Sequence, residues 1–121
     1  MINWIEFNNA HKYYGNEIIC EIIDMFEFGD EGENNGYVAR LSALKNAIEQ
    51  KDFISINKIA HSLAGVLGNF YDPVAVTLGK NIEKMGKEQT EENLAETFAE
   101  FKSAVHSLFA ELDEYRKKNK R

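Results

Sequence analysis

The chain has 121 residues, of which 44% are hydrophobic and 28% are charged, and its formal net charge is −6. This length and balance predict one globular domain over 1–121, large enough to bury a core. The acidic charge disfavours nucleic-acid binders, which normally present a basic face. No apolar run reaches the length of a membrane span.

Cysteine usage bears on the compartment. Cys20 is the single cysteine, so no disulfide framework or zinc-binding cysteine set can be built. It stands in the apolar run EIICEII, where we expect a buried small hydrophobe. We find no signal-peptide pattern at the start of the sequence. These features predict a soluble, cytoplasmic, free-standing module.

A short first helix is predicted over 4–13. Asn3 can cap it, because its side-chain oxygen can accept from the free N–H groups of the first turn. Gly15 is expected to break it. The apolar side of this helix is formed by Trp4, Ile5 and Phe7.

Two longer helices follow. Asn16 is expected to cap a helix over 17–28, and another is predicted over 37–50. Between them the segment 29–36, GDEGENNG, has no apolar residue and predicts a mobile loop. Apolar residues recur every three or four positions in both helices: Ile19, Ile22, Ile23 and Phe26 in the first, and Tyr37, Leu41, Leu44 and Ile48 in the second.

Two helices are predicted in the middle of the chain. Asp52 can cap a helix that carries the stretch 56–70, INKIAHSLAGVLGNF. Asp72 can cap the next one, with Pro73 in the first turn, where its missing N–H costs nothing. Gly86 is expected to end that helix. Its apolar residues are Leu78, Ile82 and Met85.

The last helix carries the strongest periodic signal. Thr90 is expected to cap it, with Glu91 and Glu92 in its first turn. Its apolar seam consists of Leu94, Phe98, Phe101, Val105, Leu108, Leu112 and Tyr115. The basic run 116–121 predicts a solvated tail, with a weak docking or anionic-surface role as the alternative. The whole pattern predicts an all-α, up-and-down four-helix bundle with one or two extra N-terminal or short helices.

One histidine lies on the polar side of its helix. The face opposite His61 is apolar and consists of Ile56, Ile59, Leu63, Val66, Leu67 and Phe70. On a helical wheel Gly65 and Gly68 lie about +40° and about −20° from His61. Glycine costs roughly 1 kcal/mol against alanine in a helix, and surface positions favour strong helix formers. The two glycines therefore predict that a partner's active site approaches the imidazole.

The neighbours of His61 limit its chemistry. A metal site would need a second ligand three or four residues away, but Asn57, Lys58, Ala64 and Gly65 occupy those positions. No carboxylate is expected to orient the ring, and no serine or cysteine completes a triad. A neutral imidazole can still accept and return a phosphoryl group. The plain alternative is an ordinary surface histidine.

The stretch AHSLAGVLGNF, 60–70, resembles the signature of histidine-containing phosphotransfer (HPt) domains, roughly A-H-x-L-K-G followed by small residues and often G-N, here Gly68 and Asn69. About three-quarters of the chain can be laid on this family. The resemblance implies a phosphorelay intermediate in which His61 exchanges phosphate with receiver aspartates. The implied partners are a response-regulator receiver domain or a hybrid sensor histidine kinase. The receiver would supply Mg²⁺, so no cofactor is expected on this chain, which we expect to be a monomer.

One departure from the family pattern keeps a second function open. The family usually has lysine where this chain has Ala64, and we expect Lys58, with Asn57 as a neutral donor, to substitute for it. Ile54, about 20° from His61 on the wheel, is the candidate docking residue. The alternatives are an HPt-like adaptor that binds without carrying phosphate, and an unrelated bundle. His11 and His106 carry no motif, and we expect His106 at the surface.

Overall fold

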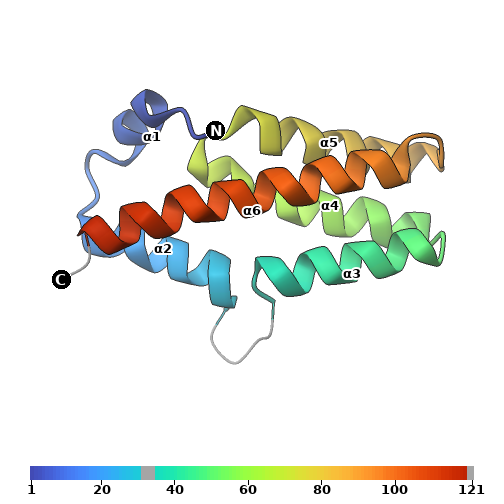
Figure 1. Cartoon of the computed structure of the whole chain (residues 1–121), viewed down its shortest axis with the longest axis horizontal. Helices are drawn as coiled ribbons and strands as arrows, with labels where there is room; N and C mark the ends of the chain where they lie inside the picture. Colours follow the sequence, from blue (N-terminus) through green and yellow to red (C-terminus); the bar gives the residue numbers. More distant parts are fainter. Residues whose placement is uncertain (31–34, 120–121) are drawn as a thin grey trace.

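The computed structural model describes residues 1–30 and 35–119. In that part of the chain the regular elements are helices, and no strand occurs, so the all-α prediction is confirmed. The elements are α1 (Trp4–His11), α2 (Asn16–Phe28), α3 (Tyr37–Glu49), α4 (Phe53–Leu67), the 3₁₀ helix η1 (Gly68–Phe70), α5 (Pro73–Glu88) and α6 (Leu94–Asn119). Figure 1 shows an elongated helical bundle with α1 at one end.

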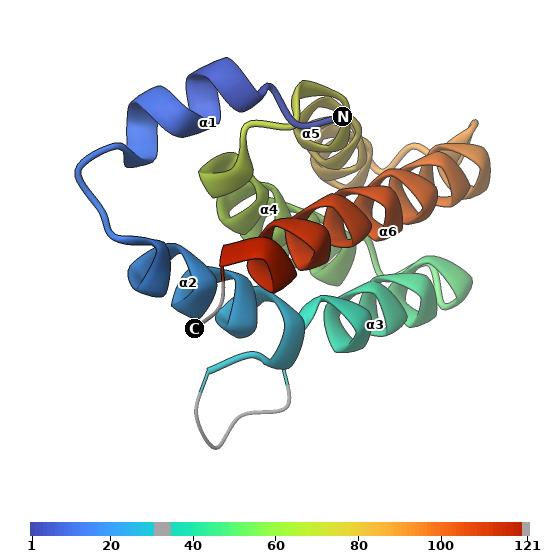
Figure 2. The same cartoon turned by 60° about the vertical axis from the view of Figure 1, so that its left-hand side comes forward.

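The long helix α6 is the spine of this bundle. It packs against α5 on one side and against α2 and α3 on the other, and α2 and α3 follow one another along its length (Figures 1 and 2). The predicted seam is confirmed, because burying a stripe at this spacing keeps one face of the helix against its neighbours. Its buried members are Leu94, Phe101, Val105, Leu108 and Leu112, and Phe98 and Tyr115 are partly buried.

Three of the predicted helix caps are confirmed. Asn3 accepts a hydrogen bond from the N–H of Glu6 at 3.2 Å. Asp52 accepts from the N–H of Ser55 at 3.2 Å, and Asp72 accepts from that of Ala75 at 3.1 Å. Each cap satisfies an N–H that has no partner inside its own helix, which fixes where α1, α4 and α5 begin.

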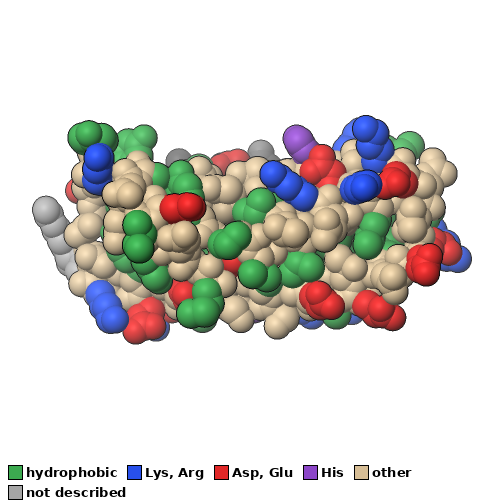
Figure 3. Space-filling model, turned by 90° about the horizontal axis from the view of Figure 1, so that it is seen from above, with side chains coloured by type: hydrophobic (Ala, Val, Ile, Leu, Met, Phe, Trp, Pro, Cys, Tyr) green, Lys and Arg blue, Asp and Glu red, His purple; other side chains and the backbone are tan. Residues whose placement is uncertain are grey.

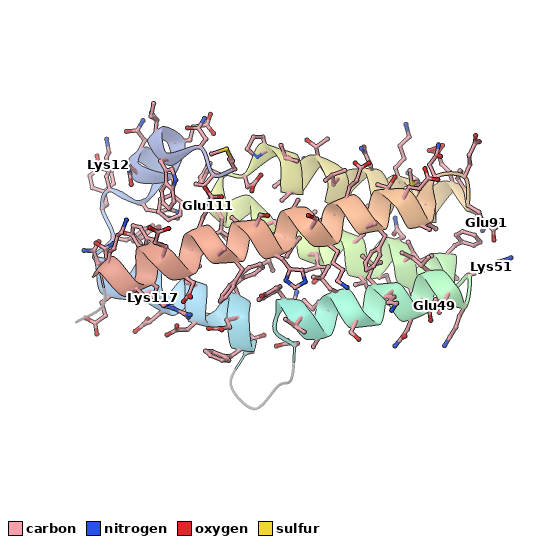
Figure 4. The ribbon with its side chains drawn as sticks, in the orientation of Figure 1. Lys12, Glu49, Lys51, Glu91, Glu111 and Lys117 are labelled. Atoms are coloured by element: carbon pink, nitrogen blue, oxygen red, sulfur yellow. The ribbon has the colours of Figure 1, made fainter. Side chains whose placement is uncertain are left out.

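Two other cap predictions are wrong. Asn16 is the first residue of α2 rather than its cap. Its Oδ1 accepts a hydrogen bond, 3.2 Å long, from the hydroxyl of Tyr115 on α6. Thr90 does not begin the last helix, since α6 starts at Leu94. Glu91 therefore precedes the helix. Its Oε1 lies 3.3 Å from Nζ of Lys51, and this pair joins two connections at one end of the bundle (Figure 4).

Gly86 does not end α5, which continues to Glu88 and closes at Gln89 with a positive φ of 56°. A Cβ on Gly86 would lie 2.7 Å from the backbone N of Asn57 on α4 and 3.0 Å from its Cα. A real Cβ cannot come that close to backbone atoms. This glycine therefore permits the close packing of α4 and α5, and it does not end the helix.

Several exposures differ from the sequence predictions. Ile5 is 76% exposed, so only Trp4 and Phe7 form the packed side of α1. Cys20 is partly exposed rather than buried.

α1 ends at His11, before the predicted limit. Most of the predicted mobile loop, 31–34, lies outside the described residues. None of the described helices is long and apolar enough to cross a membrane.

The start of the predicted solvated tail is a partly buried ion-pair cluster. The side chain of Arg116 is 12% exposed, and its guanidinium lies 2.7 Å from carboxylate oxygens of Asp24, Glu27 and Asp113. Burial acts to lower the pKa of Arg116, but the hydrogen bonds that its guanidinium donates to the three carboxylates outweigh burial and raise the pKa. Arg116 thus joins α6 to α2. Lys117 is exposed and pairs with Asp113 at 3.1 Å, and residues 120–121 are outside the described part.

Candidate functional site: the His61 groove between α4 and α5

His61 projects from α4 on the side away from the core. Its side chain is 75% exposed. The predicted apolar face is confirmed: Ile56, Leu63, Leu67 and Phe70 are buried, and Ile59 and Val66 are partly buried. Figure 3, which looks onto the side of the bundle that carries α5, shows a histidine side chain beside acidic and basic side chains. The helix thus presents the imidazole to solvent in a charged setting.

A carboxylate from α5 orients the imidazole, so the prediction that no carboxylate does so is wrong. Oε2 of Glu83 lies 2.8 Å from Nδ1 of His61, and Glu83 is 30% exposed. Because an ionised carboxylate only accepts hydrogen bonds, Nδ1 carries the proton. In the neutral ring, Nε2 then has no hydrogen and keeps a free lone pair.

The close packing of α4 and α5 places Glu83. It lies four residues after Gly79 and three before Gly86, so the three share one face of α5. A Cβ at Gly79 would lie 3.4 Å from the Cβ of Ala64 on α4, which is an ordinary contact, and 3.1 Å from Cε1 of Phe101 on α6. Asn57 on α4 donates from Nδ2 to the backbone carbonyl of Glu83 at 2.8 Å. The close approach of the α4 backbone to Gly86 and the hydrogen bond from Asn57 therefore hold Glu83 beside His61.

The glycines beside His61 have a different environment from those on α5. A Cβ on Gly65 or on Gly68 would meet nothing within 4 Å. Packing within this chain therefore does not require glycine at either position. The space they leave is open and adjoins the imidazole, as the helical wheel predicted.

These residues line an open groove of about 860 Å³ between α4 and α5. From α4 and its C-terminal end it is lined by Asn57, His61, Ala64, Gly65 and Gly68, and from α5 by Val76, Lys80, Glu83, Lys84, Lys87 and Glu88. The α5 side was missed by the sequence analysis. The sequence does carry one sign of this side: Glu83 lies between Gly79 and Gly86 on one face of the helix.

Three predicted site residues do not line the groove. Lys58 and Ile54 are exposed on α4, and Ile54 is 70% exposed, so it is free to contact a partner. Asn69 faces another cavity, which has a volume of about 240 Å³. Its backbone carbonyl accepts from Nε2 of His11 at 2.8 Å, which ties α1 to the end of α4. His106 is exposed, as predicted.

Ala64 lines the floor of the groove rather than its exposed rim. It is 7% exposed, and its Cβ lies 3.4 Å from the position that a Cβ on Gly79 would take. Ala64 lies three residues after the exposed His61 on α4, but the close approach of α5 covers this position. The lysine of the family pattern is thus replaced by a small side chain packed under α5.

Among the residues that the structure describes, no group of three or more His, Cys, Asp or Glu side chains is arranged to hold a metal ion. Comparison with protein-family models, with curated proteins and with solved structures found no match to this chain. The resemblance to HPt domains therefore rests on this chain's own sequence, through the stretch 60–70 and the order of the predicted helices.

Proposed function

We propose that this protein is a phosphocarrier of the histidine phosphotransfer type. His61 accepts a phosphoryl group from an aspartyl phosphate of one receiver domain and passes it to another. The observation that carries the proposal is an exposed imidazole whose Nδ1 is hydrogen-bonded to Glu83. Open space at Gly65 and Gly68 adjoins this imidazole. A buried or unoriented histidine would not suit direct transfer between proteins.

The chemistry follows from the proton on Nδ1. The lone pair of Nε2 attacks phosphorus, an N–P bond forms, and the P–O bond to the aspartate carboxylate breaks. The imidazole becomes positively charged as it gives up its lone pair, and the Glu83 carboxylate at 2.8 Å stabilises that charge. Positioning and a metal ion supply most of the remaining catalysis in phosphoryl transfer, and the receiver is expected to bring Mg²⁺.

The fold is compatible with this role. We propose that the helical bundle is of the up-and-down four-helix type found in HPt domains, and that the protein acts in the cytoplasm as a monomer. Its partners would be a response-regulator receiver domain or a hybrid sensor histidine kinase. Ile54 and the open surface at Gly65 and Gly68 support a docking face centred on His61.

A second candidate is an HPt-like adaptor that binds a receiver or kinase without carrying phosphate. Ala64 favours it, because a buried methyl group has replaced the lysine of the family pattern. Both candidates need the same docking face. They differ in whether His61 reacts.

One experiment separates the two candidates. The protein and its His61→Gln variant are incubated with phosphorylated receiver domains, and acid-labile, base-stable phosphate is measured on each. Label on the wild type and none on the variant supports the phosphocarrier. Binding of receivers by both proteins, without label on either, supports the adaptor.

A further inference from the structure

Phosphorylation of His61 would create a local charge problem. A phosphoryl group on Nε2 adds up to two negative charges to a ring whose other nitrogen already contacts the carboxylate of Glu83. Like charges this close oppose one another, even at the surface. Lys58, which the sequence suggested as the compensating cation, does not line the groove.

The cations of the groove all come from α5. Lys80, Lys84 and Lys87 line it together with His61 and Glu83. Figure 3 shows basic and acidic side chains around a histidine on this side of a protein whose net charge is −6. Three lysines and two glutamates, Glu83 and Glu88, line the groove, so its charge is more positive than that of the acidic chain as a whole, which favours an anion there.

Helix geometry separates these three lysines. Lys80 lies three residues before Glu83 and Lys87 lies four residues after it, so both share the face of α5 that reaches His61. Lys84 also lines the groove, but it lies about 100° around the helix from Glu83, compared with about 60° for Lys80 and about 40° for Lys87. Its Nζ already pairs with Glu88 at 3.9 Å, whereas neither Lys80 nor Lys87 forms an ion pair within the described residues.

We propose that Lys80 and Lys87, one turn to either side of Glu83, bind the phosphoryl group carried by His61. They offset the charge of the phosphate beside the Glu83 carboxylate, which the residue at position 64 cannot do. This assignment rests on the proposed function, because it concerns the phosphorylated state of the same histidine. The cations that compensate the phosphate charge are then on α5, whereas the sequence suggested Lys58 on α4.

Phosphoramidate tests the assignment without any partner protein. The lone pair of Nε2 forms a bond to phosphorus, the bond from phosphorus to the phosphoramidate nitrogen breaks, and that nitrogen leaves as ammonia and takes up a proton from water. The proton on Nδ1 stays in its hydrogen bond to Glu83. Intact mass gives the rate of formation, and the His61→Gln variant identifies the labelled residue.

Four single variants are compared: Lys80→Gln, Lys87→Gln, Lys84→Gln and Lys58→Gln. Loss of one exposed cation near the phosphate is expected to slow labelling by about two- to fivefold in each of the first two. In the same two variants the ³¹P resonance of phospho-His61 is expected to titrate at higher pH. Lys58→Gln, outside the groove, serves as the matched control and is expected to label at the wild-type rate, whereas Lys84→Gln, which removes a lysine that pairs with Glu88, is expected to slow labelling less than the first two.

The outcomes distinguish this inference from the proposed function. Equal labelling and equal ³¹P titration in all four variants would overturn the lysine assignment, as would an effect confined to Lys84→Gln or Lys58→Gln. Failure of phosphoramidate to label His61 at all would also overturn it. If labelling depends on Lys80 and Lys87 but no receiver exchanges phosphate with the protein, the inference stands and the proposed function fails.

Discussion

Replacing Gly65 by alanine tests whether the open space beside His61 serves a partner. A Cβ at this position meets nothing within 4 Å, so the added methyl group causes no clash within the chain. Alanine is favoured over glycine inside a helix, so the free energy of unfolding should rise by about 0.5–1 kcal/mol. For a domain of this size that corresponds to an increase in Tm of about 2–6 °C.

The same methyl group should impair phosphotransfer. It projects from the α4 face that carries His61 and would separate that face from the surface of a docked receiver. Displacement of reacting groups by about 1 Å can cost on the order of 100-fold in rate, so we expect at least a tenfold decrease in single-turnover transfer. Labelling by small phosphoramidate should change little, because it needs no protein surface.

Gly86→Ala is the matched control. Its Cβ would lie 2.7 Å from the backbone N of Asn57 and 3.0 Å from the carbonyl oxygen of Phe53, and neither backbone atom can move aside cheaply. Overpacking of this kind typically costs about 1–3 kcal/mol. Thermal unfolding should therefore shift in opposite directions for the two variants. Unchanged transfer in Gly65→Ala, or a loss of stability there, would refute the argument that this glycine keeps the face open for a partner.

Three further predictions concern charged groups. Glu83→Gln keeps an acceptor for Nδ1 of His61 but removes the charge, so the rate of single-turnover transfer should fall about three- to tenfold. In Glu83→Ala the rate should fall further, because the acceptor is lost as well. Equal rates in both variants would contradict the positioning role of Glu83. Arg116→Met leaves carboxylates on α2 and α6 without their shared cation and should lower the free energy of unfolding by about 1–3 kcal/mol in urea titrations, whereas an unchanged midpoint would show that the cluster contributes nothing. Hydrogen bonds from Ser55 lower the pKa of Asp52. The stability that this cap provides is therefore present above the pKa of the carboxyl group in the unfolded chain, and it is lost as the pH falls through the lower pKa of the folded state. Asp52→Asn should flatten the acid side of the stability–pH curve.

Much of the fold was predictable because it is encoded at short range. The caps at Asn3 and Asp52 depend on residues three positions away, and the stripe from Leu94 to Leu112 depends on a three- and four-residue spacing. The exposure of His61 follows from the same periodicity. Such signals require no knowledge of which helix lies beside which.

The missed features depend on contacts between helices. Glu83 reaches His61 from 22 residues away along the chain, and Arg116 finds carboxylates on α2. Gly86 was misinterpreted because glycine both ends helices and permits close approach, and only the position of Asn57 decides between these roles. The burial of Ala64 has the same cause, since α5 covers a position that its own helix leaves open.

The close approach of α4 and α5 also defines a pattern that could be sought in other chains. Glycine four residues before a glutamate and another three residues after it, with a histidine 22 residues before that glutamate, would bring the carboxylate to the ring in the same way. A larger side chain at the second glycine would meet the backbone of the helix that carries the histidine, and it would separate the two helices and break the contact. A search with this spacing tests for paired helices rather than for a short motif, and it does not depend on the residue at position 64.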